Sequence, residues 1–412
     1  MHCLSWDFEK ILQDPKTTDT SNNKTINRFD NLFIITFLRK LKSVAQRNPK
    51  FKMFIQNINR KKVLISPLDW GLGHTTRCIT IVSKLLDTDV SVIVACNPEQ
   101  KILLQQEFNN IEFLPLVGYN ITYSKNQLLF PIKLLFQLPK ILLSIQKEHR
   151  WLQKTIEKHQ IDLVISDNRY GLYSRKIPCV FITHQLTIKA PFTWLEYLLQ
   201  QINYRFINSF SECWVPDFEG EKNIAGVLSH PKRLPSIPVH YIGPLARFVK
   251  DNNVPIRYQF CIILSGPEPQ RTILEDNILQ QLATVSSKCL LVRGKLNAAP
   301  ITVTNPNVTI ENHLKGTDLQ AAIQASEFVI TRSGYTSVME LLSLQKKCIL
   351  IPTPGQTEQE YLAKQLMKQK WAWCIDQKDF NLIDSLEQAS NFNYCLSDFS
   401  TDLLGEVIKK FL

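Results

Sequence analysis

The sequence lacks any uninterrupted apolar run of the roughly 18 residues that a membrane-spanning helix needs. The apolar run at residues 32–38 is also too short, and wrongly flanked, for a secretory signal. These absences exclude an integral membrane protein and predict a cytoplasmic one.

The ten cysteines include no CxxC pair, the spacing typical of metal and redox sites. Half of them lie in apolar, strand-like runs: Cys96, Cys179, Cys261, Cys289 and Cys348. We expect these to be small buried residues in a reducing cytosol, and neither disulfides nor metal ligands.

Acidic residues are fewer than basic ones, and the 412 residues carry a formal charge of +11. A basic protein suits a phosphorylated ligand, an anionic membrane or a nucleic acid. Residues 1–60 contain eleven basic and five acidic residues, so they hold +6 of that charge. The remainder is mildly basic, and we expect no nucleic-acid partner.

Residues 1–60 differ from the pattern that follows. Residues 13–31 are polar and rich in turn formers, which predicts disorder. We hypothesise that the functional protein begins at Met53, just before the first predicted strand. The preceding segment is then either an upstream translation artefact or a basic tail.

Short apolar runs alternate with helical patterns through the rest of the chain, which predicts an α/β fold with parallel sheets. Gly243 and Pro244 mark a break between two such regions. The predicted organisation is an N-terminal domain at 61–245, a linker at 246–258, a C-terminal domain at 259–392 and a helix within 393–412.

The most informative stretch is 331–352. A buried strand precedes Arg332, Ser333 and Gly334, and a helical pattern and a second strand follow. A helix that opens after a strand presents free N–H groups, which suit a phosphate. Glu340, about two turns inside, can accept hydrogen bonds from ribose hydroxyls. The alternative is a plain strand–helix turn capped by Ser333.

The first strand, residues 63–66, leads into a turn that contains Gly71 and Gly73, and we expect a helix from Thr75. His74 at the helix start can take a proton from a sugar hydroxyl. Arg77 shares its helical face and can hold a phosphate or a carboxylate. Asp69 is a second candidate base. The alternative is that His74 simply caps the helix.

Polar residues follow other predicted strands, where parallel sheets bind ligands. Asp167, Arg169 and His184 are candidate acceptor contacts, although ordinary turn chemistry explains them as well. In the second half, Ser265 and Gly266 can touch a diphosphate that Arg271 neutralises.

The order R-S-G-x-x-[ST]-x-x-E, read from Arg332 to Glu340, resembles the nucleotide-sugar motif of the glycosyltransferase family 28 C-terminal domain. That family includes the N-acetylglucosaminyltransferase that completes the lipid-linked peptidoglycan precursor. The similarity spans residues 60–390 approximately, and the GxGH at 71–74 resembles the acceptor-side loop of the same family.

The resemblance implies the GT-B fold, in which two Rossmann-like domains face each other across a cleft and the last helix returns to the first domain. It places the nucleotide base beside His313 and Leu314, and the donor on the motif that includes Tyr335 and Thr336. Glu358, Gln359 and Glu360 lie where the family contacts the donor sugar. A surface helix cap is the alternative for Glu358 and Gln359.

The implied reaction is transfer of a hexosyl group, N-acetylhexosaminyl being one form of it, from a UDP-sugar to a hydroxyl acceptor. The resemblance implies inversion and no metal or other cofactor. No Asp-x-Asp follows a predicted strand, which is compatible with that. A nucleotide-sugar epimerase of the same fold and a non-catalytic nucleotide-sugar-binding protein remain as alternatives.

Residues 127–150 are both apolar and basic. Pro131 and Pro139 are expected to break this segment into short helices. Such a segment can lie on the inner face of an anionic membrane, which suits a lipid-linked acceptor of the bacterial cell-envelope type. The alternative is a core-packing helix with lysines that reach out to solvent.

Overall fold

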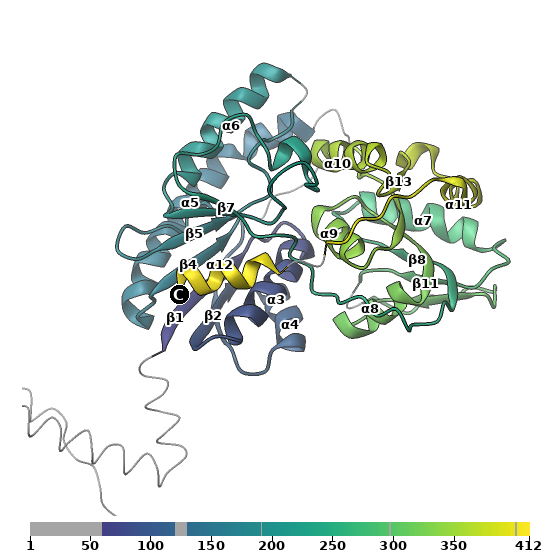
Figure 1. Cartoon of the computed structure of the whole chain (residues 1–412), viewed down its shortest axis with the longest axis horizontal. Coiled ribbons are helices and arrows are strands. Elements are labelled where there is room, and N and C mark those ends of the chain that lie inside the picture. Colours follow the sequence, from purple (N-terminus) through teal and green to yellow (C-terminus); the bar gives the residue numbers. More distant parts are fainter. Residues whose placement is uncertain (1–59, 120–129, 191, 296–297, 400–401) are drawn as a thin grey trace, which may run out of the picture. The chain divides into compact units, whose positions relative to one another are not determined.

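The structure is a computed structural model that describes residues 60–119, 130–190, 192–295, 298–399 and 402–412, with the backbone alone for 130–136 and 138. The predicted disordered extension and the hypothesised start at Met53 lie outside the described residues. Residues 61–412 form one compact unit, shown in Figure 1.

Seven parallel strands form the first sheet, in the order β3-β2-β1-β4-β5-β6-β7. Its strands are β1 (Lys61–Pro67), β2 (Val90–Cys96), β3 (Glu112–Pro115), β4 (Leu163–Asp167), β5 (Cys179–Ile182), β6 (Glu212–Val215) and β7 (Val239–Tyr241). The helices of this half are α3 (Leu72–Leu86), α4 (Pro98–Glu107), α5 (Phe130–His159), α6 (Thr193–Ile207) and the 3-10 turn η3 (Gly226–Leu228).

Six parallel strands form the second sheet, in the order β10-β9-β8-β11-β12-β13. They are β8 (Tyr258–Ile263), β9 (Cys289–Val292), β10 (Val308–Glu311), β11 (Ser326–Thr331), β12 (Lys347–Leu350) and β13 (Trp373–Cys374). The accompanying helices are α7 (Gln270–Leu282), α8 (Gly316–Gln324), α9 (Tyr335–Ser343), α10 (Thr357–Lys368), η4 (Gln377–Asp379) and α11 (Leu382–Asn391).

The strand order reverses direction once in each sheet. In the first sheet this happens between β1 and β4, which pair in register from Val63 opposite Leu163. In the second it happens between β8 and β11. Ligands bind open α/β sheets at such points, outside the carboxyl ends of the strands. Both predicted loops, after β1 and after β11, therefore lie at a switch point.

The predicted α/β fold is confirmed. The central strands are apolar on both faces, as parallel sheets covered by helices require; β1 is buried from Val63 onward and β4 throughout. The five cysteines predicted to be buried are buried and free: Cys96, Cys179, Cys261, Cys289 and Cys348.

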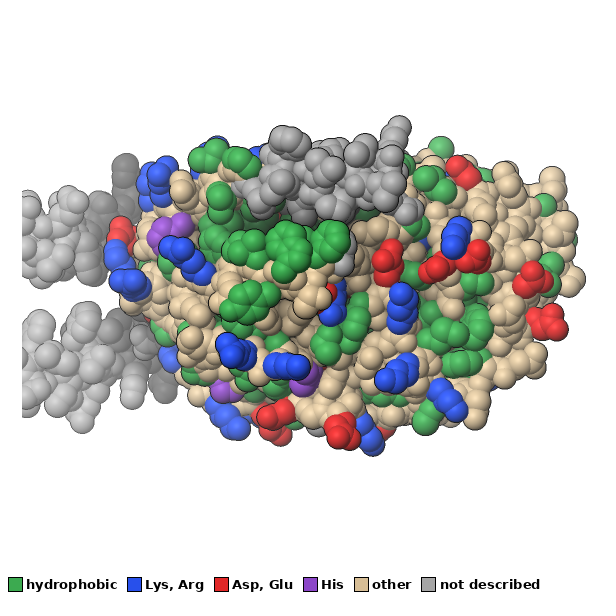
Figure 2. Space-filling view, turned by 90° about the horizontal axis from the view of Figure 1, so that it is seen from above, with side chains coloured by type: hydrophobic (Ala, Val, Ile, Leu, Met, Phe, Trp, Pro, Cys, Tyr) green, Lys and Arg blue, Asp and Glu red, His purple; other side chains and the backbone are tan. Residues whose placement is uncertain are grey.

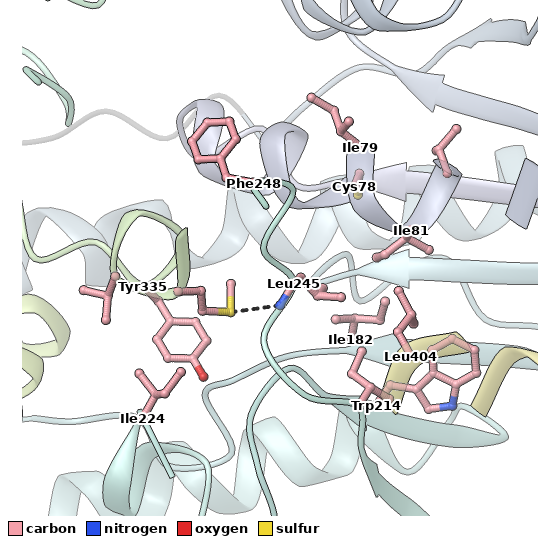
Figure 3. Packing of buried hydrophobic residues seen from close by; sticks show 14 of the residues in the cluster. Cys78, Ile79, Ile81, Ile182, Trp214, Ile224, Leu245, Phe248, Tyr335 and Leu404 are labelled. Carbon is pink, nitrogen blue, oxygen red and sulfur yellow. Dashed lines mark hydrogen bonds between the residues drawn. The ribbon is translucent and has the colours of Figure 1, made fainter. Parts of the chain in front are cut away.

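The segment after β7 packs between the two sheets. Leu245 and Phe248 are buried in the largest apolar cluster, together with α3 and α9. Figure 3 shows Leu245 donating its backbone N–H to the sulfur of Met339, an N···S distance of 3.3 Å, with Tyr335 and Ile224 close by. One apolar core thus joins residues from both halves.

The last helix, α12 (Leu403–Phe411), returns to the first sheet and packs on α3 (Figure 1). Phe411 meets Trp214 edge to face at 5.7 Å, and Lys84 pairs with Asp402 at 2.6 Å. The C-terminal return that the resemblance implied is confirmed.

The predicted break of 127–150 into short helices is wrong for the described part, because α5 runs without interruption from Phe130 to His159. Pro131 falls in the first turn, where a missing N–H costs nothing. Pro139 lies inside the helix at an exposed position, and the helix continues past it although proline donates no N–H. Residues 127–129 are outside the described part.

No helix among the described residues is long and apolar enough to cross a bilayer.

Candidate active site

The helix that carries His74 begins earlier than predicted, at Leu72 instead of Thr75. Gly71, at φ 77°, is its N-cap and no side chain caps it. His74 therefore lies in the first turn, and the structure does not show the capping role considered as an alternative. Its ring faces the end of β4 instead.

Asp167, the last residue of β4, lies between two side chains of α3. Its carboxylate is 3.0 Å from His74 Nδ1 and accepts from Arg77 Nε at 2.9 and 3.0 Å. Burial alone would raise the pKa of Asp167, but the charges of Arg77 and His74 outweigh it and hold the pKa at about 2. Asp167 is therefore ionised at neutral pH.

His74 is neutral at the same pH. Burial, and then the charge of Arg77, lower its pKa below 6.5, although Asp167 acts in the opposite direction. Because an ionised carboxylate can only accept, the contact with Asp167 is a hydrogen bond when Nδ1 carries the proton. Arg77 Nη2, 2.8 Å from Nδ1, would bond to it in the other tautomer. No described residue bonds to Nε2.

Arg77 extends this cluster toward the second half of the chain. Its Nη1 donates to His184 Nδ1 at 3.2 Å, and His184 Nε2 donates to Glu358 Oε1 of α10 at 2.7 Å. Gln185 donates to the other oxygen of Glu358. Burial would raise the pKa of Glu358, yet the electrostatic attraction of His184 and the hydrogen bond from its ring lower it. Arg77 was predicted to hold a phosphate or a carboxylate, and in the structure it holds the carboxylate of Asp167.

The starts of α3 and α9 touch each other. Thr336 Oγ1 donates to the carbonyl of Gly73 at 3.1 Å, and a Cβ on Gly73 would lie 3.2 Å from the same hydroxyl. A side chain at this position would require the Thr336 hydroxyl to shift by a few tenths of an ångström, so the close approach favours glycine. Tyr335 stacks on His184 at 4.1 Å and donates to the carbonyl of Pro216 at 2.6 Å. The predicted donor and acceptor sides therefore meet here.

The motif after β11 is arranged differently from a capped turn. The N-cap of α9 is Gly334, and Ser333 donates its hydroxyl to the carbonyl of Gln359 at 2.9 Å. Arg332 is buried and donates to the carbonyls of Ile351 and Gln270, at 3.3 and 2.8 Å. Burial lowers the pKa of Arg332 to about 10. Its predicted role toward a diphosphate stays a prediction.

Arg271 is buried among carboxylates. It pairs with Glu268 at 2.7 Å and with Glu275 at 3.1 Å, and Glu275 also binds Arg293 at 2.6 Å. Its charge is thus already balanced inside the protein, and its predicted contact with a diphosphate is untested.

Ser265 and Gly266 lie in the turn between β8 and α7. Gly266 adopts φ 102°, a left-handed conformation that favours glycine. A Cβ there would lie 3.6 Å from Thr353 Oγ1, a buried hydroxyl for which the described residues offer no partner. Thr353, which sequence analysis missed, follows the end of β12 and gives this loop a free donor.

Gln359 and Glu360 shape the loop before α10. Gln359 Oε1 accepts from Thr353 N at 2.9 Å, and Glu360 Oε1 accepts from Gly355 N at 2.9 Å. Of the three predicted sugar contacts, Glu358 is the one that points to the first half of the chain.

Glu340 lies in α9 and accepts from Arg247 Nε at 2.6 Å. His313 and Leu314 line a cavity of about 460 Å³ together with Gln106, Pro300, Ile310, Glu311, Asn312, Lys315 and Asp318. His313 Nε2 is buried there without a partner among the described residues. The structure thus places the predicted base contacts on a cavity wall.

Asp69, the second candidate base, and Arg169, a candidate acceptor contact, both have partners inside the protein. Asp69 accepts from the backbone N–H of Tyr119 at 3.0 Å and so holds the loop after β3. Arg169 has no exposed surface, and its guanidinium donates to Glu148 at 2.8 Å and to the carbonyl of Val117 at 2.7 Å. The structure therefore gives Arg169 a supporting role in place of the predicted direct contact.

Sequence analysis missed Gln185 and Arg247 as well as Thr353. Gln185 directly follows His184, and its position just after a predicted strand could have marked it as a candidate site residue. Arg247 lies in the predicted linker region, where no local pattern distinguishes a functional arginine from a surface one.

Residues 270–392 match the model of the glycosyltransferase family 28 C-terminal domain. This part of the chain is therefore similar to the glycosyltransferase family 28 C-terminal domain. The matched range contains α7, the motif after β11, and Glu358.

Curated relatives match about three quarters of this chain. An uncharacterized glycosyltransferase of Methanosarcina acetivorans is 23% identical over 332 residues, 73% of this chain and 81% of the relative. One from Methanosarcina mazei is 23% identical over 333 residues, 73% and 82% of the two chains.

Solved structures share the fold. The glycotransferase of kitacinnamycin superposes with a TM-score of 0.58 at 12% identity, over 85% of this chain and 94% of that one. Acinetobacter baumannii MurG gives 0.51 at 13% identity, over 85% and 99%. Phytolacca americana UGT2, complexed with UDP-2fluoro-glucose and pterostilbene, gives 0.54 at 12% identity, over 85% and 100%. The fold is that of GT-B glycosyltransferases, and the comparisons together support glycosyltransferase activity.

Proposed function

We propose that the chain transfers a hexosyl group from a UDP-sugar to a hydroxyl acceptor with inversion at the anomeric carbon. The observation that carries this proposal is the His74–Asp167 pair, placed at the switch point of the first sheet and connected through Arg77 and His184 to Glu358 in the family 28 domain. The pair supplies a base, and the domain supplies a donor site.

His74 Nε2 is the proposed base. It takes the proton of the acceptor hydroxyl while that oxygen attacks the anomeric carbon, and the bond from this carbon to the diphosphate oxygen breaks. The electron pair leaves with UDP. The neutral ring has its lone pair available, and Asp167 stabilises the imidazolium that forms. Asp69 is less suited to this role, since it holds Tyr119.

The donor site is proposed at the carboxyl ends of β8 and β11. The N-terminus of α9 and the free hydroxyl of Thr353 would bind the diphosphate beside Ser265 and Gly266. The cavity at His313 would take the base, and Glu340 the ribose. Helix dipoles and N–H donors can stabilise a leaving diphosphate, and metal independence stays a prediction.

We also propose a lipid-linked acceptor and peripheral contact with an anionic membrane. The outer face of α6 is apolar, which is unusual for a helix turned to solvent. Its exposed residues Trp194, Tyr197, Leu198 and Ile202 are joined by the N-cap residue, Phe192. On α5, Leu142 and Leu143 are exposed near Lys140, Lys147 and Arg150. Figure 2 shows hydrophobic side chains gathered on this face, with Lys and Arg around them.

The test is turnover and UDP binding by His74→Ala. A transferase that uses His74 as base loses at least about a hundredfold in kcat, because a positioned base contributes roughly 10²–10⁴. UDP affinity by calorimetry stays within about twofold, since the nucleotide lies on the other half. His240→Ala, on an exposed histidine of β7, is the matched control.

Unchanged turnover in His74→Ala would exclude His74 as the base. Product analysis in the same assay separates the alternatives: an epimerase converts the donor sugar without an acceptor, and a binding protein consumes no donor. Repeating the assay with EDTA tests metal independence, which predicts full activity.

A further inference from the structure

The buried carboxylate of Glu340 needs a positive partner to stay charged. Its side chain is 9% exposed, and burial raises its pKa even though Arg247 acts in the opposite direction. A carboxylate removed from water takes up a proton unless a cation pairs with it. A protonated carboxyl group accepts fewer hydrogen bonds from a sugar than an ionised one.

That partner comes from outside the second sheet. Arg247 lies between β7 and β8, and its Nε donates to Glu340 Oε1 at 2.6 Å. The backbone is anchored on both sides of it. Leu245 N donates to Met339 of α9 at 3.3 Å, and Gln320 of α8 donates to the carbonyl of Val249 at 2.9 Å. The guanidinium also lies 4.6 Å from the Phe248 ring centre.

Arg247 of this pair lies near residues of the cavity proposed for the base. A Cβ on Gly316 would lie 3.2 Å from Arg247 Nη1 and 2.8 Å from Glu107 Oε1 of α4. His313, on the cavity wall, has its pKa lowered by burial and then by the charge of Arg247. Among the described residues Arg247 is the charged group that acts on Glu340; Glu107 and His313 lie around Arg247.

We propose that Arg247 is a positioning residue, which fixes Glu340 as an ionised acceptor so that the vicinal hydroxyls of a ribonucleoside diphosphate donate to its second oxygen. No described residue donates to that oxygen, Oε2. The inference rests on the proposed donor site. It makes the connecting segment between the two sheets a determinant of ribose recognition.

The experiment measures UDP and 2′-deoxy-UDP binding to the full chain by calorimetry from pH 6 to pH 9. Arg247→Ala is expected to weaken UDP binding at least tenfold at pH 7 and to recover part of the loss at pH 9, where Glu340 ionises without help. Binding of 2′-deoxy-UDP changes less. Arg247→Lys keeps the charge and loses less affinity. Arg257→Ala, an exposed arginine before β8, leaves binding unchanged.

The double variant Arg247→Ala/Glu340→Gln should bind UDP no more weakly than Glu340→Gln alone, because Arg247 acts through Glu340. Additive losses, or a loss in Arg247→Ala that is the same at every pH, would overturn the proposal.

A nucleotide-free measurement separates this inference from the proposed function. In Arg247→Ala the folded pKa of Glu340 lies further above its unfolded value. Stability is therefore lost as pH rises from about 4.5, in comparison with Arg247→Ala/Glu340→Gln. If the parent binds no UDP, the donor site fails as proposed. The role of Arg247 in the ionisation of Glu340 is then tested by this difference in stability alone. Equal pH profiles of stability for Arg247→Ala and Arg247→Ala/Glu340→Gln would overturn it.

Discussion

His74 is held by charge as well as by its helix, and this gives the reaction a defined pH dependence. Because burial and Arg77 lower the pKa of His74, the acid limb of kcat/KM should lie below pH 6.5. Activity falls as pH drops through that lowered pKa, where the ring gains a proton and ceases to be a base.

The variant Asp167→Asn tests whether the acid limb belongs to His74. It removes the negative charge that raises the pKa of His74, so the acid limb should move to still lower pH while kcat falls at least about a hundredfold as the ring loses its orientation. A pH–rate profile of both enzymes checks this. An acid limb at or above pH 6.5 in the parent, or an unchanged limb in the variant, would contradict it.

Loss of the buried ion pair between Arg169 and Glu148 is expected to lower the stability of the protein in a way that depends on pH. Arg169→Met leaves Glu148 buried without its partner, which should destabilise the protein by about 3–5 kcal/mol. Burial already raises the pKa of Glu148, and loss of the Arg169 charge raises it further. Native Glu148 then holds a proton that the unfolded chain releases, so the variant is weaker at pH 8 than at pH 5.

Urea unfolding at the two pH values measures this, with Arg175→Met at an exposed position as the control. A loss that does not depend on pH would indicate a packing defect instead of an unpaired carboxylate.

Local patterns were enough to predict His74 as a candidate, since it stands at a helix start after a buried strand. Its partner Asp167 lies 93 residues away, and it was predicted only as an acceptor contact. Arg169, two residues later, looked equivalent in the sequence but turns inward to Glu148. Side-chain direction after a strand depends on which neighbouring loops pack there, and one sequence carries no such signal.

At the level of elements, strands were easier to predict than helix limits. Each strand of the sheet centres is a short apolar run that ends in a polar or glycine-containing turn. The predicted helix limits were wrong where a glycine or a proline lies inside a helix. Gly73 lies inside the first turn of α3, in close contact with Thr336 of α9. Pro139 lies inside α5 on its exposed side.

Pro139→Ala should therefore stabilise the protein. Proline inside a helix is less favourable than alanine by about 3 kcal/mol, and part of that is already offset by solvation of the exposed turn, so we expect a gain of about 1–2 kcal/mol. Thermal unfolding measures it. Pro98→Ala is the matched control: Pro98 is at the first position of α4, where proline is favourable, and no gain is expected. A loss of stability in Pro139→Ala would show that the local bend is required by packing.

For the whole molecule, the apolar face of α6 and the basic residues of α5 predict binding to anionic vesicles. Trp194→Glu/Tyr197→Glu places two carboxylates on the exposed face and should reduce sedimentation with phosphatidylglycerol vesicles at least fivefold. Binding to phosphatidylcholine vesicles should be weak for both proteins. Ile383→Glu, at an exposed apolar position on α11, is the control.

Equal sedimentation of the parent with both lipids would remove the electrostatic part of this prediction. Parent and variant that sediment equally with anionic vesicles would place the contact elsewhere on the chain.

The return of α12 to the first sheet means that the chain crosses between the two sheets twice, once after β7 and once before α12. Two covalent connections, together with the apolar core that both halves share, restrict the relative motion of the sheets more than a single connection would. Any separation of the two halves at the site must break the hydrogen bonds of His184 to Glu358 and of Thr336 to Gly73, because both bonds join residues of the two halves.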